Sequence, residues 1–168
     1  DRRFNLLSSE ISKKLNVKVK YVSVFNYVAA VSGFRTKDLD FVWFGGLSGT
    51  QARIQTPNSL IIAQRDIDKN FKSVFIVNKK LKLEQAKSIN DLKQLKNLRF
   101  TFGSENSTSG RLMPQYFLNL AGININDFKN KRASFSGSHD STIALVNSGA
   151  FEAGALNKQL WERNFKKN

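Results

Sequence analysis

The sequence contains no cysteine, two prolines and a single histidine among its 168 residues. Without cysteine the chain can form neither a disulfide framework nor a thiolate metal site, and a single histidine argues against a zinc site. No apolar run is long enough to cross a membrane, and the opening residues "DRRFNLL" lack the apolar core of a signal peptide. We therefore expect no metal and no cofactor, and a chain that folds through its own hydrophobic core.

Acidic residues are also scarce, because 13 Asp and Glu face 27 Lys and Arg and the formal net charge is +14. An excess of this size favours anionic partners through long-range attraction. The basic residues are spread along the chain, and the short clusters "NKKLK", "KNKR" and "FKKN" are not interleaved with aromatic residues. This pattern favours solvated faces and predicts no nucleic-acid partner, and a basic nucleic-acid-binding domain is kept as an alternative.

Apolar periodicity predicts helices and strands that alternate along the chain. Predicted helices cover residues 4–15, 26–36, 47–55, 88–97, a segment ending at Gly122, 138–149 and 157–168. Predicted strands cover residues 17–24, 39–46, 59–64, 72–78, 98–103, 132–137 and 151–156, and a charged link at 65–70 is expected to cross between two lobes. Such alternation predicts an α/β fold with a parallel sheet and crossover helices.

Ligands of open α/β sheets bind where strands end and the following helices begin. Four such junctions are visible, namely "VFNY", "WFGGLSGT", "SENSTSG" and "SGSHDST". A helix N-terminus leaves backbone N–H groups unpaired and has a partial positive charge, so it attracts anions without a lysine. These junctions are the candidate binding loops.

Three consecutive hydroxyl residues mark one junction, namely Ser107, Thr108 and Ser109. One hydroxyl is enough to cap a helix, so three of them between Gly103 and Gly110 indicate that an oxygen-rich ligand is held there, although a plain capping turn is the alternative. Pro114 fits only near a helix start, which predicts a cap close to Ser109 or Gly110. The glycine spacing does not match a Walker A loop.

His139 and Asp140 lie at the predicted start of another helix, in "GSHDST". A serine-dependent phosphate or ester hydrolase would use His139 as the base for Ser107 or Ser109, but no G-x-S-x-G elbow accompanies it. His139 can instead donate to an oxyanion. Asp140 can fix the histidine tautomer, accept from a protonated ligand oxygen, or cap the helix, and without a ligand we favour the cap.

The ordered set of motifs resembles one family, the periplasmic solute-binding proteins of phosphonate, phosphite and phosphate ABC importers. The resemblance covers nearly the whole chain and is carried by "FNYVAAVSGFRTKDLDFVWFGGLSGTQA", "SVFIV", "FGSENSTSGRLMPQYFL" and "SGSHDSTIALVNSGAFEAGAL". It implies a type II periplasmic-binding-protein fold, in which two α/β lobes with parallel-rich sheets close about a hinge over an oxyanion. It also implies no catalysis, delivery of the ligand to a membrane permease, and a periplasmic or lipid-anchored monomer.

The resemblance also implies the ligand contacts. The hydroxyls of Ser107, Thr108 and Ser109, together with His139 and Asp140, would hold the anion from the second lobe, and Tyr27 from the first. The family motif has proline after its first glycine, whereas this chain has Gly45, Gly46 and then "GTQAR", so Gln51 and Arg53 are expected to alter the anion preference. The family position before "SV" is commonly aromatic, but here it is Lys72 after Phe71.

The resemblance divides the chain into a partial lobe 1 at residues 1–70, a lobe 2 at 71–157 and a helix at 158–168. Family members begin with a strand before the first helix and continue past the last one, so we expect a fragment of a longer protein. Phosphite or a small phosphonate is the favoured ligand, because an ammonium tail would require a carboxylate cluster that these loops lack. Phosphate is kept as an alternative.

Overall fold

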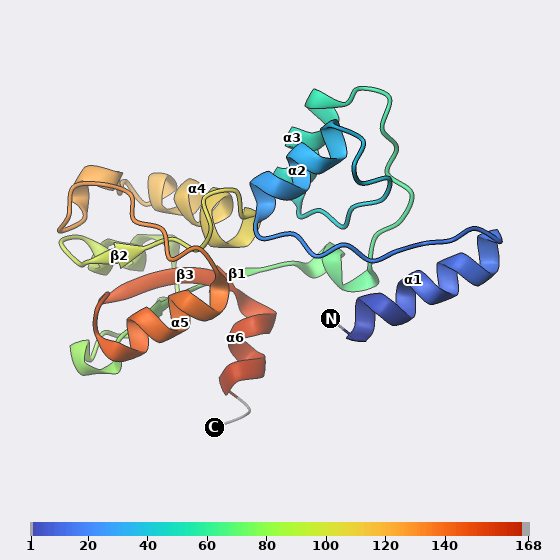
Figure 1. Ribbon diagram of the computed structural model, residues 1–168. Coiled ribbons are helices and arrows are strands. Elements are labelled where there is room, and N and C mark those ends of the chain that lie inside the picture. The colour runs from blue at the N-terminus through green and yellow to red at the C-terminus, as the bar shows by residue number, and fades with distance from the viewer. Residues whose placement is uncertain (1, 166–168) are drawn as a thin grey trace.

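The computed structural model describes residues 2–165, in which helices pack on a small sheet and a helical part adjoins it (Figure 1). The helices are α1 Arg2–Leu15, α2 Tyr27–Arg35, α3 Gly46–Gln55, α4 Met113–Leu120, α5 His139–Ser148 and α6 Lys158–Phe165. The strands are β1 Ser73–Val77, β2 Phe100–Thr101 and β3 Ala153–Asn157. None of the described helices is long and apolar enough to cross a membrane.

Five short helical segments connect these elements: η1 Asp66–Asn70, η2 Lys79–Leu81, η3 Ile89–Leu95, η4 Thr108–Leu112 and η5 Ile125–Asp127. The helix predicted at 88–97 is the 3-10 segment η3, and its predicted face is confirmed because Leu92 and Leu95 are buried. It ends early because Asn97 takes a left-handed conformation with a φ of 62° and reverses the chain.

The sheet has the order β1-β3-β2. β2 runs parallel to β3, as predicted, with Phe100 opposite Ala153, whereas β1 runs antiparallel to β3, with Phe75 opposite Ala155. The sheet is therefore mixed. The carboxyl ends of β2 and β3 meet at one edge, and the antiparallel β1 begins there, so the segment entering at residue 73 and α6 lie close together.

Helices cover both faces of the sheet (Figure 1). On the α4 face, Leu118 joins a core with aromatic side chains of β2 and the loops, in which the Phe100 and Phe128 rings stack at 4.6 Å. On the α5 face, Val146 packs with buried apolar side chains of β1 and β3. A Cβ at Gly154 would lie 2.7 Å from a Thr142 methyl carbon, so this glycine lets α5 approach β3.

Several predicted strands are wrong. Residues 17–24, 39–46 and 59–64 form no strand, since within residues 2–165 no neighbouring segment pairs with them. Leu60 is 83% exposed although its segment is apolar. The segment predicted at 132–137 supplies only Phe135, which forms an isolated parallel bridge with Phe102. A strand is stable only when another strand satisfies its backbone groups, and periodicity alone does not supply that partner.

The helical part contains α2 and α3, which pack against each other. Asn26 begins the helix predicted at 26–36 and caps α2, because its Oδ1 accepts from the Ala29 N–H at 2.8 Å. The rings of Phe34 and Phe44 meet edge to face at 5.6 Å. α1 stands to the side of both parts (Figure 1), where Phe4 stacks on Tyr21 at 5.4 Å.

Candidate anion-binding site

The loop that follows β2 begins with a helix cap at Ser107. This residue is 2% exposed, and its Oγ accepts from the Gly110 N–H at 3.0 Å. The predicted cap at Ser109 or Gly110 is therefore wrong by two or three residues. The helix starts as the π-turn η4 before α4, because Pro114 has no N–H to donate to Gly110, and the Gly110 carbonyl accepts from the Gly103 N–H at 2.8 Å instead.

The two glycines that frame the hydroxyl residues make room for an imidazole. A Cβ at Gly110 would lie 3.1 Å from His139 Cε1, and a Cβ at Gly103 would lie 3.5 Å from His139 Nδ1. The backbones of the two glycines also touch, since a Cβ at Gly103 would lie 3.2 Å from the Gly110 Cα. The start of α5 therefore packs directly against the start of η4.

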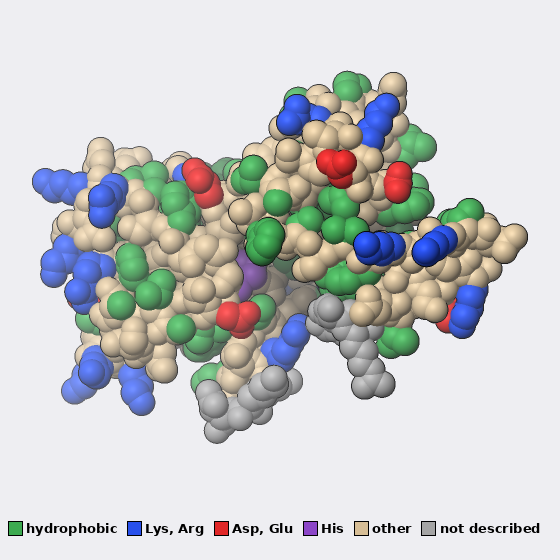
Figure 2. Space-filling model, viewed as in Figure 1, with side chains coloured by type: hydrophobic (Ala, Val, Ile, Leu, Met, Phe, Trp, Pro, Cys, Tyr) green, Lys and Arg blue, Asp and Glu red, His purple; other side chains and the backbone are tan. Residues whose placement is uncertain are grey.

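His139 is the first residue of α5. Its Nδ1 is buried and has no hydrogen-bond partner among the described residues. Burial lowers the pKa of His139 below its ordinary value of 6.5, against the opposing effect of the neighbouring Asp140 carboxylate. The imidazole is therefore neutral at pH 7, with one buried ring nitrogen free for a ligand. Figure 2 shows this single histidine, in purple, between the two parts of the molecule.

The predicted cap at Asp140 is wrong. Ser138 is the N-cap of α5, and its Oγ accepts from the Ser141 N–H at 3.1 Å. Asp140 is exposed in the first turn of α5, where a carboxylate is favoured by the helix dipole. No hydrogen bond in the described part of the chain joins it to His139, so its remaining roles are through charge or through contact with a ligand.

Two helix starts thus offer unpaired donors at one place. The N–H groups of Thr108 and Ser109 in η4, and those of His139 and Asp140 in α5, lie in first turns and have no intrahelical acceptor. Ser109 is 2% exposed, so its hydroxyl lies within the packed start of η4. The Ser107 hydroxyl accepts from Gly110 and keeps its own proton to donate. Such neutral donors and helix ends suit an oxyanion.

The helical part reaches this loop through α3. The Leu47 N–H donates to Thr108 Oγ1 at 2.8 Å, and Gln51 Nε2 donates to Asn106 Oδ1 at 3.3 Å. Gly45 and Gly46 lie beside Thr108, since a Cβ on either would lie within 3.6 Å of its Oγ1. The structure therefore brings three predicted site residues, Gly45, Gly46 and Gln51, to the loop of Ser107, Thr108 and Ser109.

Tyr27 and Arg53 have no such contact in the described part of the chain. Tyr27 is the half-buried first residue of α2, and Arg53 is exposed in the last turn of α3. No hydrogen bond or ion pair among the described residues joins either side chain to the loop. Phe71 and Lys72 are both exposed just before β1, and the Lys72 carbonyl accepts from the Lys158 N–H.

Sequence reasoning missed Asn157, the last residue of β3. It is 6% exposed, its Oδ1 accepts from the Leu160 N–H at 2.9 Å, and its Nδ2 is buried without a partner among the described residues. Because β3 is parallel to β2, Asn157 ends its strand at the sheet edge that leads to the hydroxyl loop. The available signal is a polar residue that closes the apolar strand "AGALN", whereas the sequence pattern places Asn157 at the start of the predicted helix 157–168.

Arg111 lies in η4, two residues after Ser109. Its guanidinium lies 4.6 Å from the centre of the Phe102 ring and 5.5 Å from that of Phe135. Burial lowers its pKa, although Glu105 nearby raises it, and its Nε is buried without a partner in the described part of the molecule. Arg111 therefore places a positive charge one turn beyond the hydroxyl residues.

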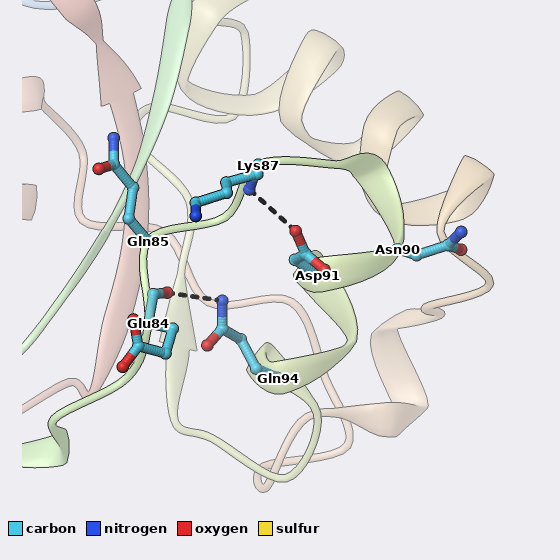
Figure 3. A pocket seen from close by; sticks show the side chains of 6 residues that line it. All are labelled: Glu84, Gln85, Lys87, Asn90, Asp91 and Gln94. Carbon is cyan, nitrogen blue, oxygen red and sulfur yellow. Dashed lines mark hydrogen bonds between the residues drawn. The ribbon is translucent and has the colours of Figure 1, made fainter.

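An open depression of about 430 Å³ lies elsewhere (Figure 3). It is lined by Glu84, Gln85, Lys87, Asn90, Asp91 and Gln94. Its polar groups are used locally, because Asp91 accepts from the Lys87 N–H at 2.8 Å and Gln94 donates to the Glu84 carbonyl at 3.1 Å. Two carboxylates on its wall repel an anion, so it does not compete with the hydroxyl loop as an oxyanion site.

The sequence matches the profile of a family described as "ABC transporter, phosphonate, periplasmic substrate-binding protein" over residues 1–168. The chain belongs to this family. Members of this phosphonate-binding family are solute-binding components of transporters and not enzymes, which removes the support for the serine-hydrolase alternative. The predicted family and its type II periplasmic-binding fold are confirmed.

Two relatives extend this result. The chain is 74% identical over 168 residues to the probable ABC transporter phosphite binding protein PhnD1 of Prochlorococcus marinus (strain MIT 9301), which covers all of this chain and 57% of that protein. It is 34% identical over 142 residues to the phosphonates-binding periplasmic protein of Escherichia coli (strain K12), covering 82% of this chain and 40% of that protein. The family assignment therefore does not depend on one relative.

Two solved structures share the fold. PhnD1 of Prochlorococcus marinus in complex with methylphosphonate superposes with a TM-score of 0.96 over 99% of this chain and 61% of that one. A binding protein component of an ABC phosphonate transporter from Pseudomonas aeruginosa is 22% identical and superposes with a TM-score of 0.69, over 94% of this chain and 52% of that one. At this identity it supports the fold alone. The chain spans between 40% and 61% of the length of these three proteins, PhnD1 being compared both as a sequence and as a structure.

Proposed function

We propose that this chain forms the anion-holding part of an extracytoplasmic solute-binding protein that captures a small phosphorus oxyanion for an ABC importer. The observation that carries the proposal is the buried, unpartnered Nδ1 of His139 packed against the glycines that frame the hydroxyl loop. A buried polar atom without a partner costs free energy, so it is expected to have one when the protein works. A ligand oxygen at this point meets the donors of two helix starts.

The donor set favours phosphite or a small phosphonate. Its members are hydroxyls, backbone N–H groups, a neutral imidazole and the Asn157 amide, which together suit a compact group of phosphorus oxygens. The Asn157 Oδ1 already accepts from the Leu160 N–H, and its unpartnered Nδ2 is a donor, which suits a phosphorus oxygen and not an ammonium group. The methylphosphonate complex of PhnD1, which is 74% identical to this chain, supports the same ligand class. Phosphate is the remaining alternative.

The two parts of the fold supply the two walls of this site. We assign residues 1–70 to lobe 1, 71–157 to lobe 2 and 158–168 to a helix that leads away from lobe 2; residues 1 and 166–168 lie outside the described range. Ser107, Thr108, Ser109, His139 and Asp140 would act from lobe 2, and Tyr27, Gly45, Gly46, Gln51 and Arg53 from lobe 1. The ligand would bind the closed state more tightly than the open state, and this difference in affinity would drive the lobes to close.

The remaining features follow from the family. The partner would be a membrane ABC permease, and the protein would act as a periplasmic or lipid-anchored monomer without nucleic acid. A basic nucleic-acid binder is the competing function, and it predicts DNA affinity that falls steeply with salt. The charge of +14 is the feature that supports that alternative.

Calorimetric titration of the full-length protein with phosphite, methylphosphonate, phosphate and sulfate tests the proposal. We expect one binding site, with phosphite or methylphosphonate preferred over sulfate. Titration with a short DNA duplex at low and high salt is the matched control for the competing function. Failure to bind any of the phosphorus oxyanions would overturn the proposal, and DNA affinity that falls steeply with salt would support the competing function.

A further inference from the structure

We propose that Thr108, Asn106 and Gln51 form a clasp that couples closure of the two lobes to the occupied anion loop. The inference rests on the proposed function, because a clasp matters only if the lobes close on a ligand. It assigns Gln51 and Asn106 as positioning residues that hold α3 against the loop. Thr108 has a double role, toward α3 and toward the anion.

The start of α3 lacks a cap of its own. Its N-cap residue is Gly45, which has no side chain, and Ser48 supplies only the reverse bond by accepting from the Gly45 N–H at 3.2 Å. The Leu47 N–H therefore has no acceptor within α3, and the Thr108 hydroxyl of the opposite lobe accepts from it at 2.8 Å. The cap of a lobe-1 helix is thus supplied by the anion loop of lobe 2.

The two glycines before α3 provide the space for this contact. A Cβ at Gly46 would lie 3.3 Å from Thr108 Oγ1 and 3.6 Å from its methyl carbon, and a Cβ at Gly45 would lie 3.6 Å from the same oxygen. Neither glycine has a positive φ that would require glycine for conformational reasons. The close approach of Thr108 therefore explains glycine at position 46, whereas a Cβ at Gly45 would meet only ordinary contacts.

A second bond lies on the same face of α3. Gln51 is four residues after Leu47, so the two project from one side of the helix. Its Nε2 donates to Asn106 Oδ1 at 3.3 Å, and Asn106 directly precedes the Ser107 cap. The two bonds therefore join one turn of α3 to the hydroxyl loop at both sides of Ser107.

The Thr108 hydroxyl connects the clasp to the ligand. A hydroxyl that accepts a hydrogen bond still has one proton to donate, and the proton of Thr108 Oγ1 is available to an anion oxygen. Hydrogen bonds in such a chain polarise and strengthen one another. An anion on the loop therefore strengthens the bond to α3, and the clasp in turn slows release of the anion.

A double-mutant cycle on Gln51 and Asn106 tests the clasp while leaving the hydroxyl residues and His139 unchanged. We expect Gln51→Ala and Asn106→Ala each to weaken methylphosphonate binding by roughly 2- to 10-fold, and the double variant to lose no more than either one. Gln55→Ala, an exposed glutamine of the same helix, should bind as the wild type does. Thermal unfolding of each variant verifies that it is folded.

Thr108 provides the second arm. Thr108→Ser keeps the hydroxyl and should retain affinity within about 3-fold, whereas Thr108→Val keeps the shape and should lose more than either Gln51→Ala or Asn106→Ala. Because the chain has no cysteine, spin labels at Arg35→Cys and Lys129→Cys, both exposed and one on each lobe, report the lobe distance. With saturating methylphosphonate, Gln51→Ala should enlarge the open population.

The experiments distinguish failure of the clasp from failure of the proposed function. If the wild type binds no phosphorus oxyanion, the proposed function fails. If the wild type binds methylphosphonate but Gln51→Ala and Asn106→Ala have unchanged affinity and lobe distance, the function stands and the clasp is overturned. Effects of the two variants that simply multiply would also overturn it, because partners in one bond must be coupled.

Discussion

At the scale of single residues, the proposed site depends most on His139. Its imidazole is held by the glycines at 103 and 110, and its Nδ1 is buried without a partner in the described structure. We expect His139→Ala to weaken methylphosphonate binding by about 1 to 3 kcal/mol, because an anionic acceptor loses one donor. Calorimetry measures this loss, with the exposed Asn147→Ala on the same helix as control. Unchanged affinity would remove His139 from the site.

The buried imidazole also makes stability depend on pH. Burial lowers its folded pKa below the ordinary 6.5, so the unfolded chain takes up a proton at a pH where the folded protein does not. With respect to His139, the free energy of unfolding is therefore highest above pH 6.5, and it falls as the pH drops from 6.5 toward the lower pKa of the folded state. Urea unfolding of the ligand-free protein at about pH 7.5 and about pH 5.5 should show a larger loss for the wild type than for His139→Gln. Equal losses would contradict burial of this group.

At the scale of elements, the approach of η4 to α5 depends on Gly110. A Cβ there would lie 3.1 Å from both His139 Cε1 and Ser107 Oγ. We expect Gly110→Ala to cost about 1 to 3 kcal/mol of stability through overpacking and to weaken anion binding as well. Gly45→Ala is the matched control for stability, because its Cβ would meet only ordinary contacts at 3.6 Å or more. Thermal or urea unfolding compares the two, and equal stability would argue against this packing.

The same scale separates what the sequence could predict from what it could not. Helix ends depend on local sequence, so the helix starts at Asn26 and Ser88 could be predicted from neighbouring residues. The helix ends at the left-handed Gly122 and Gly149 could be predicted in the same way. Strands depend on partners far along the chain, which is why apolar segments such as 59–64 were assigned wrongly. The cap lies at Ser107, two or three residues before the predicted position, because Pro114 and the Gly103–Gly110 hydrogen bond create a π-turn at the start of the helix. No local sequence pattern predicts that turn.

The site shows the same division. The hydroxyl residues and His139 could be proposed from the sequence because each lies in a contiguous motif, and the structure packs the two motifs against each other. Asn157 was missed because its relevance arises only when β3 ends beside β2. The hydrogen bond between Leu47 and Thr108 joins residues 61 positions apart, and no sequence pattern predicts it.

At the scale of the whole molecule, the net charge of +14 is spread over the surface and attracts anions at long range. Lysine and arginine side chains are distributed over both parts of the face shown in Figure 2. We expect the association rate of methylphosphonate to fall as salt is raised, with little change in the dissociation rate, because distant charges act on encounter and are screened. Rapid-mixing kinetics at several salt concentrations measure both rates. An association rate independent of salt would contradict this steering.

The central claim is that the anion is held where η4 and α5 begin, against the hydroxyl residues and His139. A crystal structure of the full-length protein grown with methylphosphonate tests it most directly. The predicted result is a phosphonate whose oxygens lie within about 3 Å of Ser109 Oγ, the Thr108 N–H and a ring nitrogen of His139, with Leu47 still bonded to Thr108. A phosphonate bound elsewhere, or one that leaves His139 Nδ1 and the Ser109 hydroxyl without partners, would contradict the account.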